Sequence, residues 1–182
     1  MNARIESLTL IERSCWQELE NAAAQRSHPW RTMALATTDG KVGHARMVIL
    51  REVDAAQQRL IVYTDARSAK ASQIATHPLG TLLAWSAGLG WQLRLRCRFA
   101  LDSGGLAASS RWARLKLTPA AQDYLSPLAP GSELTPYESP RAPREHFALV
   151  VATVEAIDWL ELHADGHRRA AFDDRGARWL QP

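Results

Sequence analysis

Hydrophobic and polar residues alternate along most of this chain, a pattern typical of half-buried β-strands. The clearest case is 91–101, where every second residue is apolar and the residues between are Gln, Arg or Ala. Successive side chains of a strand point to opposite faces. One face of this segment is therefore expected to lie in the core and the other to be polar and cationic.

The same criterion predicts further strands at 30–38, 42–51, 59–65, 81–86, 146–162, 167–172 and 177–180. Turn signals separate these segments, among them Asp39-Gly40, Asp165-Gly166 and residues 173–176. An interruption is expected near Asp158 in the long strand. Short strands joined by hairpin turns favour an antiparallel sheet.

Helices are predicted at few places. Thr9 and Glu12 have the spacing of a capping box, and an apolar stripe follows them, which predicts a helix over 10–26. Ser68 is expected to cap a second helix that ends before Pro78. A third helix is expected over 106–117, with a short one after Thr118-Pro119.

These elements predict one domain, 1–182, that is mainly β with a few α-helices and closes into a barrel with helical covers. The N-terminal helical segment would occupy 1–28. Residues 126–145 contain prolines at 127, 130, 136, 140 and 143, so this stretch is expected to be a loop.

Composition narrows the function classes. The chain has 182 residues, 46% of them hydrophobic and 23% charged, with a net charge of +3, as in a soluble globular protein. This charge is too small to argue for nucleic acid, and no apolar run reaches the ~20 residues that span a membrane. Cys15 and Cys97 are expected to be buried thiols, and the N-terminus lacks the apolar segment of a signal peptide, so a cytoplasmic location is expected. The six histidines are scattered, and no metal site is predicted.

One stretch carries candidate chemistry. Arg46 lies on a predicted strand, Thr64 ends the next strand, and Ser68 and Lys70 begin the helix that follows. Free backbone N–H groups at a helix start bind anions, Arg offers a planar fork, and Lys offers a point charge. These four residues are therefore expected to converge on a small anion, with phosphate the obvious candidate.

The motifs in this region, taken in order, resemble the pyridoxamine 5′-phosphate oxidase family. They are Arg46-Met-Val-Ile-Leu-Arg51, Tyr63-Thr64, Ser68-x-Lys70, Gln92 and Trp159. The resemblance covers about 30–180 and is closest to a short branch with R-x-V-x-L-R, T-D-x-R-S-x-K and Q-x-R motifs. It implies an FMN-binding split β-barrel, antiparallel and Greek-key-like, that forms a homodimer with FMN in clefts at the subunit interface.

The resemblance also implies which residues contact FMN: Arg46, Met47, Val48, Ile49, Leu50, Arg51, Tyr63, Thr64, Ser68, Lys70, Gln92 and Trp159. Arg46, Ser68 and Lys70 resemble the residues at the phosphate end. The strand 47–50 resembles the one whose backbone runs beside the isoalloxazine ring. Gln92 resembles an amide that hydrogen-bonds the flavin, and Trp159 resembles an aromatic near the ring.

The chain departs from the family pattern at two places. Arg51 stands where the oxidase usually has lysine. The oxidase has R-x-H-x-R in its last hairpin, whereas this chain has His167-Arg-Arg-Ala-Ala-Phe172, which places Ala171 at the last arginine. His167 and Arg169 are candidate substrate residues, and His167, Arg168 or Arg169 could replace the missing arginine.

These departures shape the functional hypotheses. The leading one is an FMN-dependent oxidoreductase acting on a small molecule, distinct from pyridoxamine 5′-phosphate oxidase itself, with catalytic residues and substrate left open. The alternative is a non-catalytic flavin-binding or sensing protein. A third hypothesis, from another class, is single-stranded nucleic-acid binding by Arg94, Arg96 and Arg98 with stacking on Trp91 or Trp112.

Overall fold

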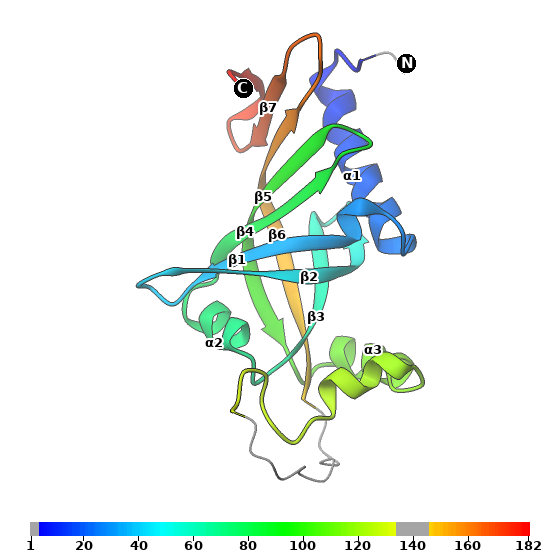
Figure 1. Ribbon diagram of the computed structural model, residues 1–182, viewed down its shortest axis with the longest axis vertical. Coiled ribbons are helices and arrows are strands. Elements are labelled where there is room, and N and C mark those ends of the chain that lie inside the picture. Colours follow the sequence, from blue (N-terminus) through cyan, green and yellow to red (C-terminus); the bar gives the residue numbers. More distant parts are fainter. Residues whose placement is uncertain (1–3, 134–145) are drawn as a thin grey trace.

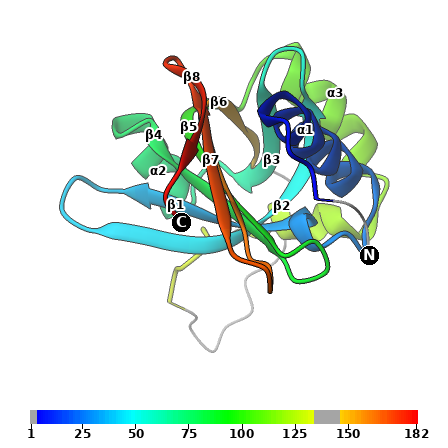
Figure 2. The ribbon, with the colours of Figure 1, turned by 90° about the horizontal axis from the view of Figure 1, so that it is seen from above.

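The computed structural model describes residues 4–133 and 146–182. Its strands form one antiparallel sheet: β1 Thr32–Thr38, β2 Gly43–Asp54, β3 Arg59–Asp65, β4 Leu79–Ser86, β5 Trp91–Asp102, β6 Phe147–Glu161, β7 Arg168–Asp173 and β8 Gly176–Leu180. The hairpin expected at Asp39-Gly40 joins β1 to β2 and projects from the body of the molecule in both ribbon views (Figures 1 and 2).

Six of the strands close into a barrel. The sheet order is β3-β2-β1-β4-β5-β6-β7-β8, and β3 also pairs with β6, which completes the ring. β7 and β8 continue the sheet outside the ring, alongside the far end of β6 (Figure 1). The antiparallel barrel is therefore confirmed. The interruption expected near Asp158 is wrong, because β6 runs unbroken and only its register with β5 shifts, between Arg96 and Cys97.

Three α-helices and two 3₁₀ turns cover the barrel. The helices are α1 Leu8–Ala24, α2 Ala69–Thr76 and α3 Leu106–Leu115, and the turns are η1 Pro29–Arg31 and η2 Pro119–Tyr124. α1 packs on β2 and β8, whereas α2 packs on β1 and β5. α2 and α3 lie at the end of the molecule opposite the β7–β8 hairpin (Figure 1). Among the described residues, no helix is long and apolar enough to cross a membrane.

The apolar side chains form two clusters. The larger fills the barrel and includes the apolar stripe of α1, and the predicted inward face of β5 belongs to it, with Leu93, Leu95 and Cys97 fully buried. Cys15 is also buried, and both cysteines are free thiols. The smaller cluster lies outside the barrel wall, where Trp112 of α3 and Tyr124 of η2 pack against Phe147 of β6.

A β-bulge in β2 redirects its side chains. The register with β3 shifts between Leu50 and Glu52, which leaves Arg51 as the extra residue. Arg51 lies over the ring of Tyr63, 5.3 Å from its centroid, and Glu52 pairs with Arg111 of α3. The bulge therefore places Glu52 against α3 and Arg51 beside Tyr63 of β3.

Two predicted boundaries are wrong. The first helix begins at Leu8, with Ser7 as its N-cap and not Thr9, because Leu8 packs against the core two residues before the predicted start at residue 10. Trp30 lies in a 3₁₀ turn and not in a strand, because the His28 ring accepts a hydrogen bond from its amide at 3.1 Å. Of the predicted loop 126–145, residues 126–133 contain no strand, and 134–145 lie outside the described residues.

Candidate functional site

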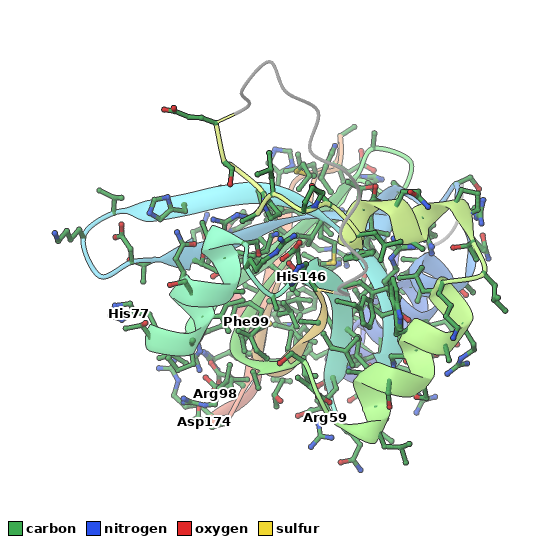
Figure 3. The ribbon with its side chains drawn as sticks, turned by 90° about the horizontal axis from the view of Figure 1, so that it is seen from below. Arg59, His77, Arg98, Phe99, His146 and Asp174 are labelled. Carbon is green, nitrogen blue, oxygen red and sulfur yellow. The ribbon has the colours of Figure 1, made fainter. Side chains whose placement is uncertain are left out.

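The barrel wall opens at one place between β2 and β3. Their pairing ends at Leu50 and Val62, so the preceding part of β2, 43–49, pairs only with β1 in the described part of the chain. The end of β3, 63–65, pairs only with β6. α2 begins directly after this end of β3, and Figure 3 views the barrel from the side on which α2 lies. The opening brings together three elements that were expected to hold an anion.

Arg46 lies at this opening and is tied to two elements. Its Nη2 donates to Oε1 of Gln73 on α2 at 3.0 Å. Its Nη1 donates to the hydroxyl of Thr37 on β1 and to the carbonyl of Leu35 at 3.4 Å. Thr37 in turn donates to Gln73 Oε1 at 2.6 Å. These bonds hold the guanidinium in one orientation before any ligand arrives.

Lys70 completes the site from α2. Its Nζ donates to Thr64 Oγ1 at 3.1 Å, and the hydroxyls of Thr64 and Ser68 lie 3.2 Å apart. Ser68 is the N-cap residue, as predicted, but its hydroxyl makes no capping bond. The structure therefore brings Arg46, Thr64, Ser68 and Lys70 together, as the sequence predicted.

Among the described residues, the two cations have no counter-ion. Burial and the nearby charge of Arg46 lower the pKa of Lys70, and burial lowers the pKa of Arg46. Asp65 is the carboxylate that acts on Lys70, but it is bound to Arg67 at 2.7 Å. In residues 4–133 and 146–182, no carboxylate forms an ion pair with Arg46 or Lys70. Two half-buried positive charges with no described carboxylate partner favour a bound anion.

Sequence reasoning missed Thr37 and Gln73. Gln73 lies three residues after Lys70, on the same face of α2, and this spacing was a usable signal. Thr37 had no such signal, because only the pairing of β1 with β2 brings it to Arg46. Both side chains are buried and orient the guanidinium.

The expected contacts on β2 divide between two faces. Val48 and Leu50 point into the barrel, whereas Met47 and Ile49 point outward. Tyr63 and Thr64 also lie on opposite faces of β3, so the tyrosine is not part of the Arg46 site. Its hydroxyl donates to Glu52 at 2.9 Å, and it packs beside Arg51.

Trp159 lies elsewhere. It is fully buried in the barrel core, with its ring 5.4 Å from that of Trp91. It presents no surface to a ligand, so the structure does not support its expected place beside a flavin. Side chains alternate between the two faces of a strand. Asp158 and Leu160 point outward from β6, so Trp159 between them points into the core.

Gln92 and Arg169 lie on the outer face of the sheet. Leu160 separates them, because it pairs with Gln92 of β5 on one side and with Arg169 of β7 on the other. Arg169 binds Asp158 at 2.7 Å, and His167 lies before β7, where its ring accepts a hydrogen bond from the amide of His163.

Arg168 has a structural role. It binds Glu161 at 2.8 Å and lies over the rings of Trp159 and Trp179, 5.7 Å from each centroid. Of the three residues that could replace the missing family arginine, Arg169 is the one that binds Asp158 on the outer face.

The nucleic-acid hypothesis loses its stacking platform. Trp91 and Trp112 are 8% and 7% exposed, too little to stack on a base. Arg94 is paired with Asp158, and Arg98 with Glu155. Within the described residues, no group of three or more His, Cys, Asp or Glu side chains could hold a metal ion.

Comparison with known proteins decides the family. A family model described as pyridoxamine 5′-phosphate oxidase, FMN-binding domain, matches residues 13–102. Residues 13–102 belong to this FMN-binding domain family. The resemblance found in the sequence is therefore confirmed. The matched range contains every residue of the Arg46 site described above, including Thr37 and Gln73.

Solved structures agree with the split-barrel fold of the family. A pyridoxamine 5′-phosphate oxidase-related, FMN-binding protein from Nostoc punctiforme PCC 73102 is similar, with a TM-score of 0.73, 20% identity, and coverage of 93% of this chain and 97% of that chain. PhzG from Burkholderia lata 383, in complex with tetrahydrophenazine-1-carboxylic acid, gives a TM-score of 0.76, 18% identity, and coverage of 100% and 99%. General Stress Protein 26 from Bacillus anthracis strain Sterne gives a TM-score of 0.54 and 14% identity, with coverage of 80% of this chain and 92% of that chain. No curated protein matches the sequence.

Proposed function

We propose that this protein binds FMN and acts as an FMN-dependent oxidoreductase on a small molecule. The observation that carries the proposal is the pair Arg46 and Lys70, two half-buried cations without a carboxylate partner in the described residues. A phosphate monoester would neutralise both. The hydroxyls of Ser68 and Thr64 lie beside Lys70 and would donate to the same phosphate. The donor set therefore fits the phosphate end of FMN.

Each residue of the site has a separate task in this proposal. Arg46, fixed by Thr37 and Gln73, would orient the phosphate, and Lys70 would neutralise it. The unpaired edge of β2 at 43–49 would offer backbone groups to the remainder of the cofactor. Bound FMN would supply redox chemistry that protein side chains lack. PhzG, which has a similar fold, was solved with a small carboxylic acid, and this is compatible with a small-molecule substrate.

Titration with FMN and with riboflavin tests the proposal. Riboflavin lacks the phosphate and so serves as a matched control ligand. Two charge-assisted contacts at about 1.5–3 kcal/mol each predict that FMN binds roughly 10²- to 10⁴-fold more tightly than riboflavin. Flavin fluorescence quenching measures both affinities, and the mass of the ligand released from purified protein identifies what it carries. Equal affinities, or no flavin binding, would refute the phosphate site.

We further propose a homodimer. Met47, Leu83 and Trp85 project from the outer faces of β2 and β4 and are 62%, 37% and 45% exposed. Ala34 of β1 lies between Met47 and Leu83 in the register, so the apolar surface is continuous over three strands. A second copy would cover it. This surface adjoins the open edge of β2, so the dimer would complete the cofactor cleft.

A cytoplasmic location also remains part of the proposal.

Charges on this surface should separate the subunits. We expect Leu83→Glu with Trp85→Glu to convert a dimer to a monomer in light scattering and to weaken FMN binding, because two desolvated carboxylates would oppose association. Leu106→Glu is the matched control, since Leu106 is 86% exposed but lies on α3. A wild-type monomer that carries one FMN per chain would contradict the shared cleft.

The second candidate is a flavin-binding protein without catalysis. It is favoured by Ala171, which has no side-chain polar group at the outward position of β7, and by the structural role of Arg168. The rate at which NADPH or a candidate amine reduces the bound FMN separates the two functions. Rapid reduction supports the oxidoreductase, and no reduction by any donor supports the sensing or storage protein.

A further inference from the structure

A cavity of about 410 Å³ lies on the outer face of β5, β6, β7 and β8. It is distinct from the Arg46 site. Thr81 lines the cavity and lies in register with Ala36 of β1, which pairs with Ala45. Arg46 is the next residue and therefore points to the other side of the sheet. The residues expected to contact FMN do not line this cavity.

The wall of the cavity carries an excess of positive charge. It contains two carboxylates, Asp158 and Asp173. It also contains five arginines, from β5, β7, β8 and the β7–β8 turn: Arg94, Arg96, Arg169, Arg175 and Arg178. Five positive charges against two negative ones leave three, as many as the formal net charge of the whole chain, +3.

Each carboxylate is shared by two arginines. Asp158 accepts bonds from Arg94 and from Arg169, the latter at 2.7 and 3.0 Å. Asp173 binds Arg178 at 2.7 Å and lies 3.7 Å from Arg175. The nearest carboxylate to Arg96 is that of Glu155, outside the cavity wall, at 3.9 Å, and Glu155 binds Arg98 more closely at 2.9 Å.

The carboxylates stay ionised and hold the arginines in place. Burial opposes ionisation of Asp158, but hydrogen bonds from Arg169 and the charge of Arg94 outweigh it, so its pKa lies below the usual value. Hydrogen bonds from Arg178 likewise lower the pKa of Asp173. In the described part of the chain, three guanidinium nitrogens have no hydrogen-bond partner: Nη1 of Arg169 and both Nε and Nη1 of Arg94. These donors are available to a ligand.

We propose that this cavity binds a small molecule with two or more acidic groups, either carboxylates or phosphates. One acidic group cannot neutralise three charges, whereas a di- or trianion can. The volume is in the range of small-molecule sites, about 300–1,000 Å³. Four of the five arginines stand on strands of one sheet, so their positions are fixed before binding.

Calorimetric titration with citrate and with pyrophosphate tests the proposal, with acetate as the monovalent control. The protein is loaded with FMN so that the Arg46 site is filled, and the ionic strength is kept at about 20 mM because salt screens exposed charges. We expect both polyanions to bind and acetate not to bind. Tighter binding of citrate would assign the site to carboxylates, and tighter binding of pyrophosphate would assign it to phosphates. If neither polyanion binds, the proposal is wrong.

Because each carboxylate is shared by two arginines, one arginine of each pair can be replaced without leaving a carboxylate unpaired. In Arg94→Gln with Arg178→Gln, Asp158 keeps Arg169 and Asp173 keeps Arg175, so neither carboxylate loses all its partners. We expect this variant to bind the polyanion at least about tenfold more weakly. Arg59→Gln is the matched control, because Arg59 is an exposed strand arginine on β3 that does not line the cavity and, among the described residues, shares no carboxylate with a cavity arginine. An equal loss in the control would indicate general surface charge and overturn the site.

Two further measurements distinguish this cavity from the Arg46 site and from a nucleic-acid surface. Arg46→Ala should not retain FMN, so its polyanion titration is made without the cofactor. We expect this variant to keep polyanion binding, and a failure of the FMN proposal therefore leaves this one standing. If polyanion binding instead depends on Arg46, the cavity is not the site. A single-stranded oligonucleotide that competes with citrate, and whose own binding Arg98→Gln also weakens, would indicate a nucleic-acid surface and refute a small-molecule site.

Discussion

Replacing Arg46 with alanine will weaken FMN binding by about 10- to 150-fold, the effect of removing one charge-assisted contact worth about 1.5–3 kcal/mol. Arg46 is half-buried, oriented by Thr37 and Gln73, and has no ion pair with a described carboxylate. Its charge is therefore available for a phosphate. Fluorescence titration of FMN measures the loss.

Controls separate the loss of a ligand contact from damage to the fold. Arg59→Ala removes an arginine on β3 that is exposed and directed outward (Figure 3), and FMN affinity should not change. Riboflavin affinity should be nearly equal in wild type and Arg46→Ala, because riboflavin has no phosphate. Lys70→Ala should resemble Arg46→Ala. The double variant should lose less FMN binding free energy than the two single variants lose together, because both side chains bind the same phosphate. If Arg46→Ala and Lys70→Ala both bind FMN as wild type does, the phosphate is held elsewhere.

Replacing Trp159 with alanine will lower the free energy of unfolding by about 3–5 kcal/mol, as for other fully buried aromatic residues. The side chain is 0% exposed and packs against Trp91 and Trp179, with ring centroids 5.4 and 6.4 Å away. Arg168 also lies over its ring. Because domains are stable by only about 5–15 kcal/mol, this loss will be a large part of the total. Urea denaturation measures it.

Trp179→Ala is the matched control for this prediction. Trp179 belongs to the same aromatic group but is 44% exposed, so its removal should cost roughly 1 kcal/mol, a minor share of full burial. Trp159→Phe distinguishes a core role from a ligand role, because phenylalanine keeps much of the packing. We expect its FMN affinity to match wild type. A loss of FMN affinity in Trp159→Phe at unchanged stability would show that the tryptophan contacts the cofactor.

The anion site was predictable to the extent that its residues are close in sequence. Thr64, Ser68 and Lys70 lie at a strand end and the following helix start, where local geometry alone brings them together. Arg46 lies on a separate strand, and the sequence points to it through its charged planar fork, which suits an anion. Thr37 and Gln73 were missed, because they matter only through the guanidinium that they orient.

The structure separates several residues that the family motifs group together. Arg51 is the extra residue of a bulge, so it leaves the alternation that the neighbours of Arg46 follow. Tyr63 is next to Thr64 in its motif, but adjacent strand residues face opposite sides. Trp159 has the residue type expected beside a flavin, but burial of its large apolar ring in the core dominates its placement.

The sequence alone determined the strands, most turns, the antiparallel barrel and the family, because alternation and short motifs are local properties that need no knowledge of distant contacts. Only the tertiary structure decided which candidate residues meet. It closed the ring through β3 and β6 and left Arg46 and Lys70 without a described counter-ion. It also gathered five arginines from separate hairpins around one cavity. Such groupings depend on strand register and on the bulge. Packing over the whole barrel determines both, so no single segment of the sequence predicts them.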